Sequence, residues 1–242
     1  MANDDHLPAQ RSSQTDVDAF LRQVAAVPPP RRAPGRRGRL MFAMDATASR
    51  EPTWDHACQL QGEMFEATAD LGGLDVQLVY YRGFRECKAS PWVGGARELL
   101  VRMTAVRCLA GQTQIGRVLK HCIKEAKAEK VNALVFVGDC MEEDIDHLAQ
   151  LAGELGLLGV PAFVFHEGGD PAARRAFQTV ARLTGGAYCP FDRSSARQLK
   201  DLLAAVAVFA AGGRAALEDY SRTGSESVRL LTSQVGRAAS GG

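Results

Sequence analysis

Short apolar runs alternate with longer amphipathic stretches along most of this 242-residue chain. The apolar runs have the length of β-strands and are hydrophobic at nearly every position, which is typical of strands buried on both faces of a sheet. The stretches between them carry apolar residues at helical spacing, and some end at Gly-rich stop signals. The candidate strands cover residues 39–44, 75–81, 86–93, 131–138, 160–166 and 187–191.

This alternation predicts an α/β domain: a Rossmann-like, three-layer arrangement with a mostly parallel central sheet of about six strands and helices on both faces. Segment 86–93 fits a short antiparallel edge strand, because Pro91 suits an edge better than a central position. A last helix is expected over residues 195–211. In such sheets ligands bind at the carboxyl ends of the strands, where the strand order reverses.

The two ends of the chain differ from its middle in composition. Residues 1–37 mix proline with arginine and are expected to form a flexible tail, in which 16–27 has the spacing of a short helix. Residues 214–242, rich in Ser, Gly and Ala, are expected to be a mostly flexible extension. The domain itself is predicted over residues 38–213.

Composition and charge indicate which partners and which cellular compartment to expect. A net charge of +1 gives no general attraction to nucleic acid or to an anionic membrane. The longest apolar stretch, 202–211, is too short to span a bilayer, and no secretory signal follows Met1. The six cysteines form no CxxC pair, so they are expected to be reduced and mostly buried. We therefore expect a cytoplasmic protein.

The first candidate site residues follow the first predicted strand. Asp45, Thr47 and Ser49 alternate, so all three side chains project to the same side of an extended loop. One carboxylate and two hydroxyls suit a hard cation rather than zinc, which prefers His or Cys. Ser49 or Thr53 alternatively caps the helix that follows.

Two further oxygen-bearing residues are expected at the same edge of the sheet. Thr113 lies in a Gly-Gln-Thr-Gln segment just before a predicted helix, where it alternatively serves as an N-cap. Asp139 directly follows the buried strand 131–138, and a carboxylate there is costly unless it is paired, hydrated or bound to a metal. The conjunction of the three segments is stronger than any one of them.

Together these residues resemble the metal site of von Willebrand factor type A (VWA) domains. The Asp45 loop matches the family's D-x-S-x-S motif with Thr47 in place of the first serine, Thr113 matches the lone threonine of the second loop, and Asp139 matches the aspartate that ends the central strand. The chain departs from the family in reading Val-Gly-Asp-Cys-Met instead of the usual Ser-Asp-Gly, so a different loop shape is expected after Asp139.

The resemblance implies an intracellular VWA-like protein that binds partners through Mg²⁺ (or Mn²⁺). Its five ligands would be Asp45, Thr47, Ser49, Thr113 and Asp139, and a partner's Asp or Glu would complete the shell. It also implies an adaptor, beside an ATPase or chaperone complex in similar proteins. No nucleophile and general base are assembled around Asp45, so an enzyme is not expected.

Two points stay open at this level. Specificity must come from the surface around the ion, for which the loops near Arg50 and Gly83 are candidates; the acidic stretch 142–144 is either part of that surface or a solvated helix start. The alternative function is RNA binding through the basic N-terminal segment, which is otherwise interpreted as a solubilising linker. The arginines of that segment are Arg31, Arg32, Arg36, Arg37 and Arg39.

Overall fold

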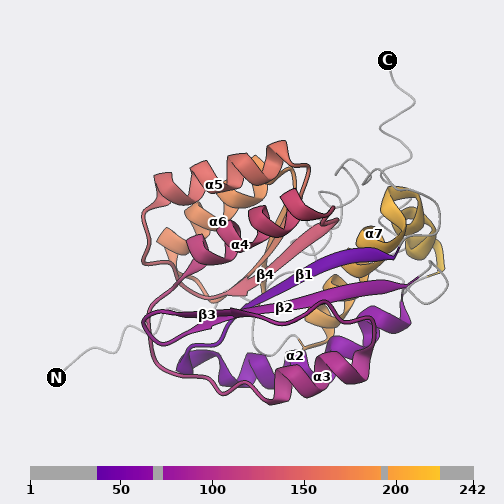
Figure 1. Cartoon of the computed structure of the whole chain (residues 1–242), viewed down its shortest axis with the longest axis horizontal. Helices are drawn as coiled ribbons and strands as arrows, with labels where there is room; N and C mark the ends of the chain where they lie inside the picture. Colours follow the sequence, from indigo (N-terminus) through magenta and orange to yellow (C-terminus); the bar gives the residue numbers. More distant parts are fainter. Residues whose placement is uncertain (1–36, 68–72, 192–195, 224–242) are drawn as a thin grey trace.

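The computed structural model describes residues 37–67, 73–191 and 196–223, which form a sheet with helices on both of its faces (Figure 1). The strands lie in the order β3-β2-β1-β4-β5-β6, and every neighbouring pair is parallel except β2 with β3. The strands are β1 (Gly38–Asp45), β2 (Leu74–Arg82), β3 (Glu86–Ala89), β4 (Ala133–Gly138), β5 (Ala162–Glu167) and β6 (Ala187–Phe191). The helices are η1 (Ala48–Arg50), α2 (Glu51–Glu66), α3 (Ala96–Thr104), α4 (Ile115–Ala128), α5 (Ile145–Leu157), α6 (Pro171–Thr184) and α7 (Ala196–Thr223).

Two hydrophobic cores explain the three layers. Alternate residues of β1 point to opposite faces, so Phe42 and Met44 pack with α2, α3 and α7, while Met41 and Ala43 pack with α4, α5 and α6. Figure 1 shows the two helical layers on either side of the sheet. Because both faces are covered, the central strands are apolar at nearly every position, and the predicted fold class is confirmed.

The strand order reverses at β1. The chain passes from β1 to β2 on one side and later enters β4 on the other side. The connections that follow β1 and β4 therefore run toward opposite edges of the sheet. Met44 pairs with Val137 in the register of β1 and β4. Asp45 and Asp139 therefore follow adjacent strands at the point where this class of sheet binds ligands.

Several boundaries differ from those predicted. Strand β3 ends at Ala89, and the rest of segment 86–93 contributes hydrogen bonds between Ser90 and Leu78 and an isolated bridge between Val93 and Val76. Helix α3 was not predicted, although its buried Leu99 and Met103 have the i, i+4 spacing of a helix face. Helix α7 continues beyond residue 211 to Thr223, across a non-helical Gly213 with φ 74°.

The predictions for both tails fall largely outside the described residues. They include the helix predicted over 16–27 and the residues after 223. The limits 38–213 for the domain stay a prediction. Among the described residues, no helix is both long and apolar enough to cross a membrane.

Candidate metal centre

Asp45 is fixed at the base of the candidate site. Its side chain is 0% exposed; Oδ1 accepts a hydrogen bond from the Thr47 amide at 2.7 Å, and Oδ2 accepts one from the Tyr81 hydroxyl at 3.1 Å. Burial raises the pKa of this carboxyl, against the lowering effect of the bonds from Thr47. A cation beside Asp45 would relieve the cost of keeping its charge away from water.

Ser49 and Asp139 meet across the gap between β1 and β4. The Ser49 hydroxyl donates to Oδ2 of Asp139 at 3.2 Å, and it lies 3.4 Å from the Thr47 hydroxyl. Oδ1 of Asp139 is enclosed and has no hydrogen bond among the described residues. Ser49 is exposed, so the site opens to solvent on this side. The structure therefore brings Asp45, Thr47, Ser49 and Asp139 together.

Thr113 belongs to the same edge, but its hydroxyl bonds a different residue. It accepts from the Glu142 amide at 3.0 Å, while the Thr113 amide donates to the Glu142 carboxylate at 3.1 Å. The N-cap of α4 is Gln114, so the interpretation of Thr113 as that cap is wrong. This reciprocal pair joins the loop before α4 to the loop after β4. That Thr113 also contacts a metal stays a prediction.

The acidic stretch 142–144 is largely used inside the fold. Glu143 reaches the start of α4, where its carboxylate accepts from the amides of Ile115 at 2.5 Å and Gly116 at 2.9 Å. Negative charge is favourable there because it meets the positive end of the helix dipole. Asp144 is the N-cap of α5. Of the three residues, only Asp144 therefore matches the expectation of a helix start. Glu142 instead bonds the loop before α4, and Glu143 bonds the first turn of α4.

The loop that carries Thr113 crosses the β2–β3 hairpin at a glycine. Leu109 donates its amide to the Ala46 carbonyl at 3.0 Å, and Gln112 donates to the Gly83 carbonyl at 3.1 Å. A Cβ on Gly111 would lie 2.0 Å from the Gly83 oxygen, a distance that no side chain tolerates without backbone movement.

We therefore expect Gly111→Ala to lower the free energy of unfolding by about 1–3 kcal/mol. Gly153→Ala is the matched control: it lies inside α5 with nothing within 4 Å of the added Cβ, and alanine there should stabilise the helix by about 0.5–1 kcal/mol. Urea denaturation of the two variants measures both values. Equal stability of the two variants would contradict the close packing of this loop.

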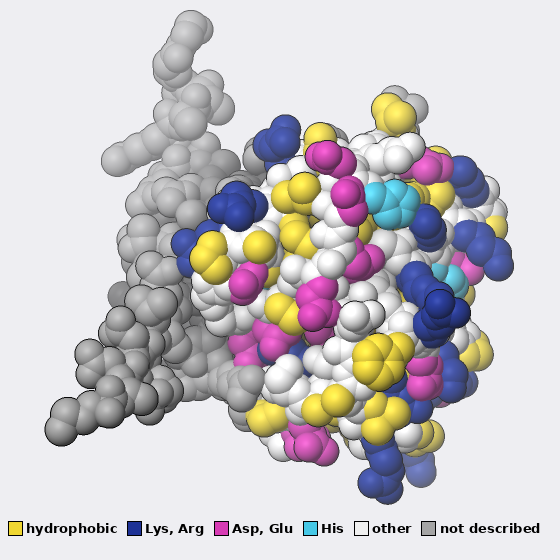
Figure 2. Space-filling view, turned by 90° about the vertical axis from the view of Figure 1, so that its left-hand side faces the viewer, with side chains coloured by type: hydrophobic (Ala, Val, Ile, Leu, Met, Phe, Trp, Pro, Cys, Tyr) yellow, Lys and Arg dark blue, Asp and Glu magenta, His cyan; other side chains and the backbone are white. Residues whose placement is uncertain are grey.

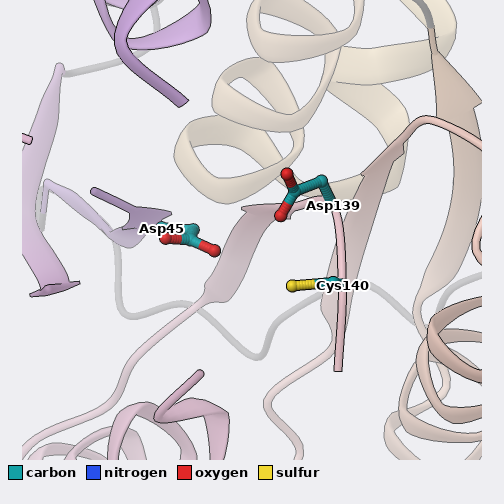
Figure 3. A group of neighbouring side chains, drawn as sticks. All are labelled: Asp45, Asp139 and Cys140. Carbon is teal, nitrogen blue, oxygen red and sulfur yellow. The ribbon is translucent and has the colours of Figure 1, made fainter. Parts of the chain in front are cut away.

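Cys140 is a ligand candidate that the sequence reasoning missed. Figure 3 shows its side chain and that of Asp139 extending from the loop after β4 toward Asp45. One ligand atom from each of these three residues lies within 4.8 Å of the others. The cysteines were expected to be small core residues, whereas Cys140 is only half-buried. The available signal was its position, directly after Asp139.

Arg50 is fully buried beside the site, where a surface loop was predicted. Its side chain is 0% exposed and forms an ion pair with Glu167, which is also buried. Its Nη1 lies 4.0 Å from Oδ2 of Asp139. With Asp45, this group holds three carboxylates and one guanidinium, a formal charge of minus two. One divalent cation would neutralise it.

His166 fixes the backbone at Asp139. Its Nε2 lies 3.1 Å from the Asp139 carbonyl and its Nδ1 lies 2.8 Å from the Tyr188 hydroxyl. Burial lowers the pKa of this imidazole, which favours the neutral ring. Because a carbonyl can only accept, Nε2 carries the proton and Nδ1 accepts from Tyr188. The sequence signal was the His-Glu pair that ends a buried strand.

Comparisons with known proteins bear on the fold. No protein-family model and no curated protein matches the sequence. Among solved structures, the VWA domain of SpRpn10 aligns with 69% of this chain and 94% of its own length, at 14% identity and a TM-score of 0.53. The chain has a VWA-like fold.

Two further solved structures are similar to the chain. Proximal thread matrix protein 1 from the mussel byssus, with a zinc-occupied MIDAS motif, aligns over 71% of this chain at 15% identity and a TM-score of 0.54. A D319A mutant of the PilB minor pilin from Streptococcus sanguinis aligns over 81% of it at 10% identity and a TM-score of 0.55. The chain spans only 46% and 65% of these two proteins, respectively.

Two of the five arginines in the basic N-terminal segment serve the VWA-like domain itself. Arg39 lies over the Trp92 ring at 3.9 Å and pairs with Glu125 and Glu129. Arg37 donates to Asp75. These contacts compete with phosphate binding, so the RNA-binding alternative rests mainly on arginines outside the described residues.

Proposed function

We propose that this VWA-like domain is a metal-dependent protein-interaction module that captures an acidic residue of a partner. The observation that carries the proposal is the meeting of Asp45, Ser49 and Asp139 at the strand-order reversal, in a group whose formal charge calls for one divalent cation. The exposed Ser49 side leaves a route of approach for the partner.

The carboxylates and the hydroxyls of the site have different roles. Asp45 and Asp139 supply negative charge from two strands, and the hydroxyls of Thr47 and Ser49 supply neutral oxygen ligands suited to Mg²⁺ or Mn²⁺. When bound, the cation offers a coordination position at which a partner's Asp or Glu replaces water. Thr113, whose hydroxyl accepts from the Glu142 amide, is proposed as a further hydroxyl for this shell.

Binding, rather than catalysis, is the activity we propose. Burial and nearby carboxylates raise the pKa of the Cys140 thiol to about 12, the opposite of what a nucleophilic cysteine needs. Both ring nitrogens of His166 are engaged, by Asp139 and Tyr188. The similar mussel protein, with its zinc-occupied MIDAS motif, supports a metal at this edge of the fold.

Apolar side chains beside the site supply a surface for specificity. Phe84 is 73% exposed and Leu109 is 47% exposed, and the Gly83 amide lies 3.5 Å from the Leu109 carbonyl. Leu109 also bonds Ala46 in the Asp45 loop, so this apolar surface adjoins the metal site. Figure 2 shows one face with acidic side chains near its middle and basic ones toward its right-hand edge and at its upper left. We propose a partner that presents a carboxylate next to apolar residues.

The setting that we propose is an adaptor in the cytoplasm, beside an ATPase or chaperone complex, on analogy with similar intracellular domains. The test immobilises the whole chain and captures protein from a cell lysate in Mg²⁺ or Mn²⁺, followed by elution with EDTA. We expect one specific partner that EDTA releases. The Phe84→Ser variant should keep its ion affinity and lose much of the capture. A partner retained equally in EDTA would contradict the proposal.

A further inference from the structure

Cys140 adds a sulfur ligand to a site that otherwise offers oxygen, and sulfur changes which ion the site prefers. We propose that Cys140 is a direct metal ligand and that this site selects Zn²⁺ over Mg²⁺. The inference rests on the metal site of the proposed function, but it concerns the identity of the ion, which the capture of a partner does not decide.

The geometry suits a small tetrahedral ion. Ligand atoms of Asp45, Asp139 and Cys140 lie within 4.8 Å of one another, and Figure 3 shows the three side chains directed into one space. Zinc–oxygen and zinc–sulfur bonds of about 2.0–2.3 Å place tetrahedral ligands roughly 3.3–3.8 Å apart. The ligand atoms must therefore approach one another by about 1.0–1.5 Å at most. Cys140 and Asp139 are only partly buried, so their side chains have room to do so.

The chemistry distinguishes the candidate ions. Thiolate is a soft ligand that binds zinc strongly, whereas Mg²⁺ takes oxygen ligands and demands six of them in octahedral geometry. Two carboxylates and one thiolate form a three-residue zinc shell, which leaves a fourth position for water or for a partner's carboxylate. The half-buried thiol therefore lies where it can bind zinc, whereas it would contribute no ligand to a site that takes only oxygen.

Two further observations agree with a cation in this space. Oδ1 of Asp139 is enclosed without a hydrogen bond to oxygen or nitrogen among the described residues, and the same carboxylate interacts with the Cys140 thiol. The fully buried Asp45 and the Arg50–Glu167 pair leave a formal charge of minus two with Asp139.

The experiment compares ion binding by the intact chain and two cysteine variants, after stripping with EDTA and removal of the chelator. Zn²⁺ affinity is measured by competition with a chromophoric chelator, Mg²⁺ affinity by calorimetry, and Co²⁺ is added as a spectroscopic substitute for zinc. Cys140→Ser removes the sulfur and keeps a hydroxyl. Cys87→Ser is the control, since Cys87 is a half-buried thiol on β3 that lies outside the cluster.

We expect the wild-type chain to bind Zn²⁺ more tightly than Mg²⁺ and to give a thiolate-to-cobalt charge-transfer band. Cys140→Ser should weaken Zn²⁺ binding by at least about tenfold and abolish the band, and it should not weaken Mg²⁺ binding. Cys87→Ser should behave as wild type. Unchanged zinc affinity and an unchanged cobalt spectrum in Cys140→Ser would overturn the inference.

Failure of this inference is distinct from failure of the proposed function. If Mg²⁺-dependent capture of a partner persists while Cys140→Ser leaves Zn²⁺ binding unchanged, only the zinc assignment is lost. If Cys140 binds zinc but partner capture ignores EDTA, only the interaction function is lost. A wild-type chain that binds neither ion contradicts both.

Discussion

Asp45→Ala is expected to abolish metal-dependent partner binding while the chain stays folded. Asp45 is the buried carboxylate at the end of β1, held by Thr47 and Tyr81 on the side of the site away from solvent. Even a charge that acts through water is worth about 10- to 100-fold in metal affinity. Calorimetric titration with Mg²⁺ and with Zn²⁺, and capture with and without EDTA, measure the loss.

The fold should survive because two effects of the substitution oppose each other. Burial raises the pKa of Asp45, so the ionised carboxylate is a cost to the metal-free domain that alanine removes. Alanine also leaves Thr47 and Tyr81 without their acceptor, so Asp45→Asn, which keeps one, is the companion variant. Asp75→Ala, at the opposite end of the sheet, is the control with unchanged ion binding. If Asp45→Ala captured the partner as well as wild type does, this would contradict the proposal that a metal ion links the domain to its partner.

Arg50→Met is expected to lower the free energy of unfolding by about 3–5 kcal/mol. The substitution keeps an apolar stem of similar length but leaves Glu167, whose side chain is 4% exposed, without its guanidinium partner. Glu167 would keep the hydrogen bond from the Thr53 hydroxyl but would lose the counter-charge that offsets its removal from water. Since domains of this size are stable by only about 5–15 kcal/mol, part of the population should unfold well below the wild-type midpoint. Urea denaturation measures the difference.

Two comparisons isolate the effect of the buried pair. Arg102→Met breaks an ion pair with Glu98 on the surface of α3 and should cost less than about 1 kcal/mol. The double variant Arg50→Met with Glu167→Gln removes both charges, and it should recover much of the stability lost in the single variant. If Arg50→Met and Arg102→Met had the same free energy of unfolding, the buried ion pair would contribute no more to stability than the surface pair.

The sequence predicted the architecture and the location of the site because both follow from local patterns. Apolar strands that alternate with helices dictate a covered, mostly parallel sheet, and Asp45 and Asp139 directly follow two of those strands. Since the carboxyl ends of parallel strands share an edge, their proximity could be inferred. Whether they share an ion stays a prediction.

What could not be predicted depends on partners that are distant in sequence. Nothing in the local pattern around Arg50 indicates burial, because its counter-charge, Glu167, is the last residue of a strand much later in the chain. Glu143 likewise acts on the start of α4 rather than on its own helix. Cys140 was overlooked because a lone cysteine is more often a core residue, and its role depends on the direction of its side chain.

The pairing of β1 with β4 also determines when the site can exist during synthesis. Asp45, Thr47 and Ser49 lie at the end of β1 and just after it, whereas Asp139 and Cys140 follow β4 and leave the ribosome only after most of the domain has been translated. A nascent chain that ends before β4 therefore carries an incomplete set of ligands. Such a chain should bind the ion and the partner weakly, so partner binding is expected only after β4 has paired with β1.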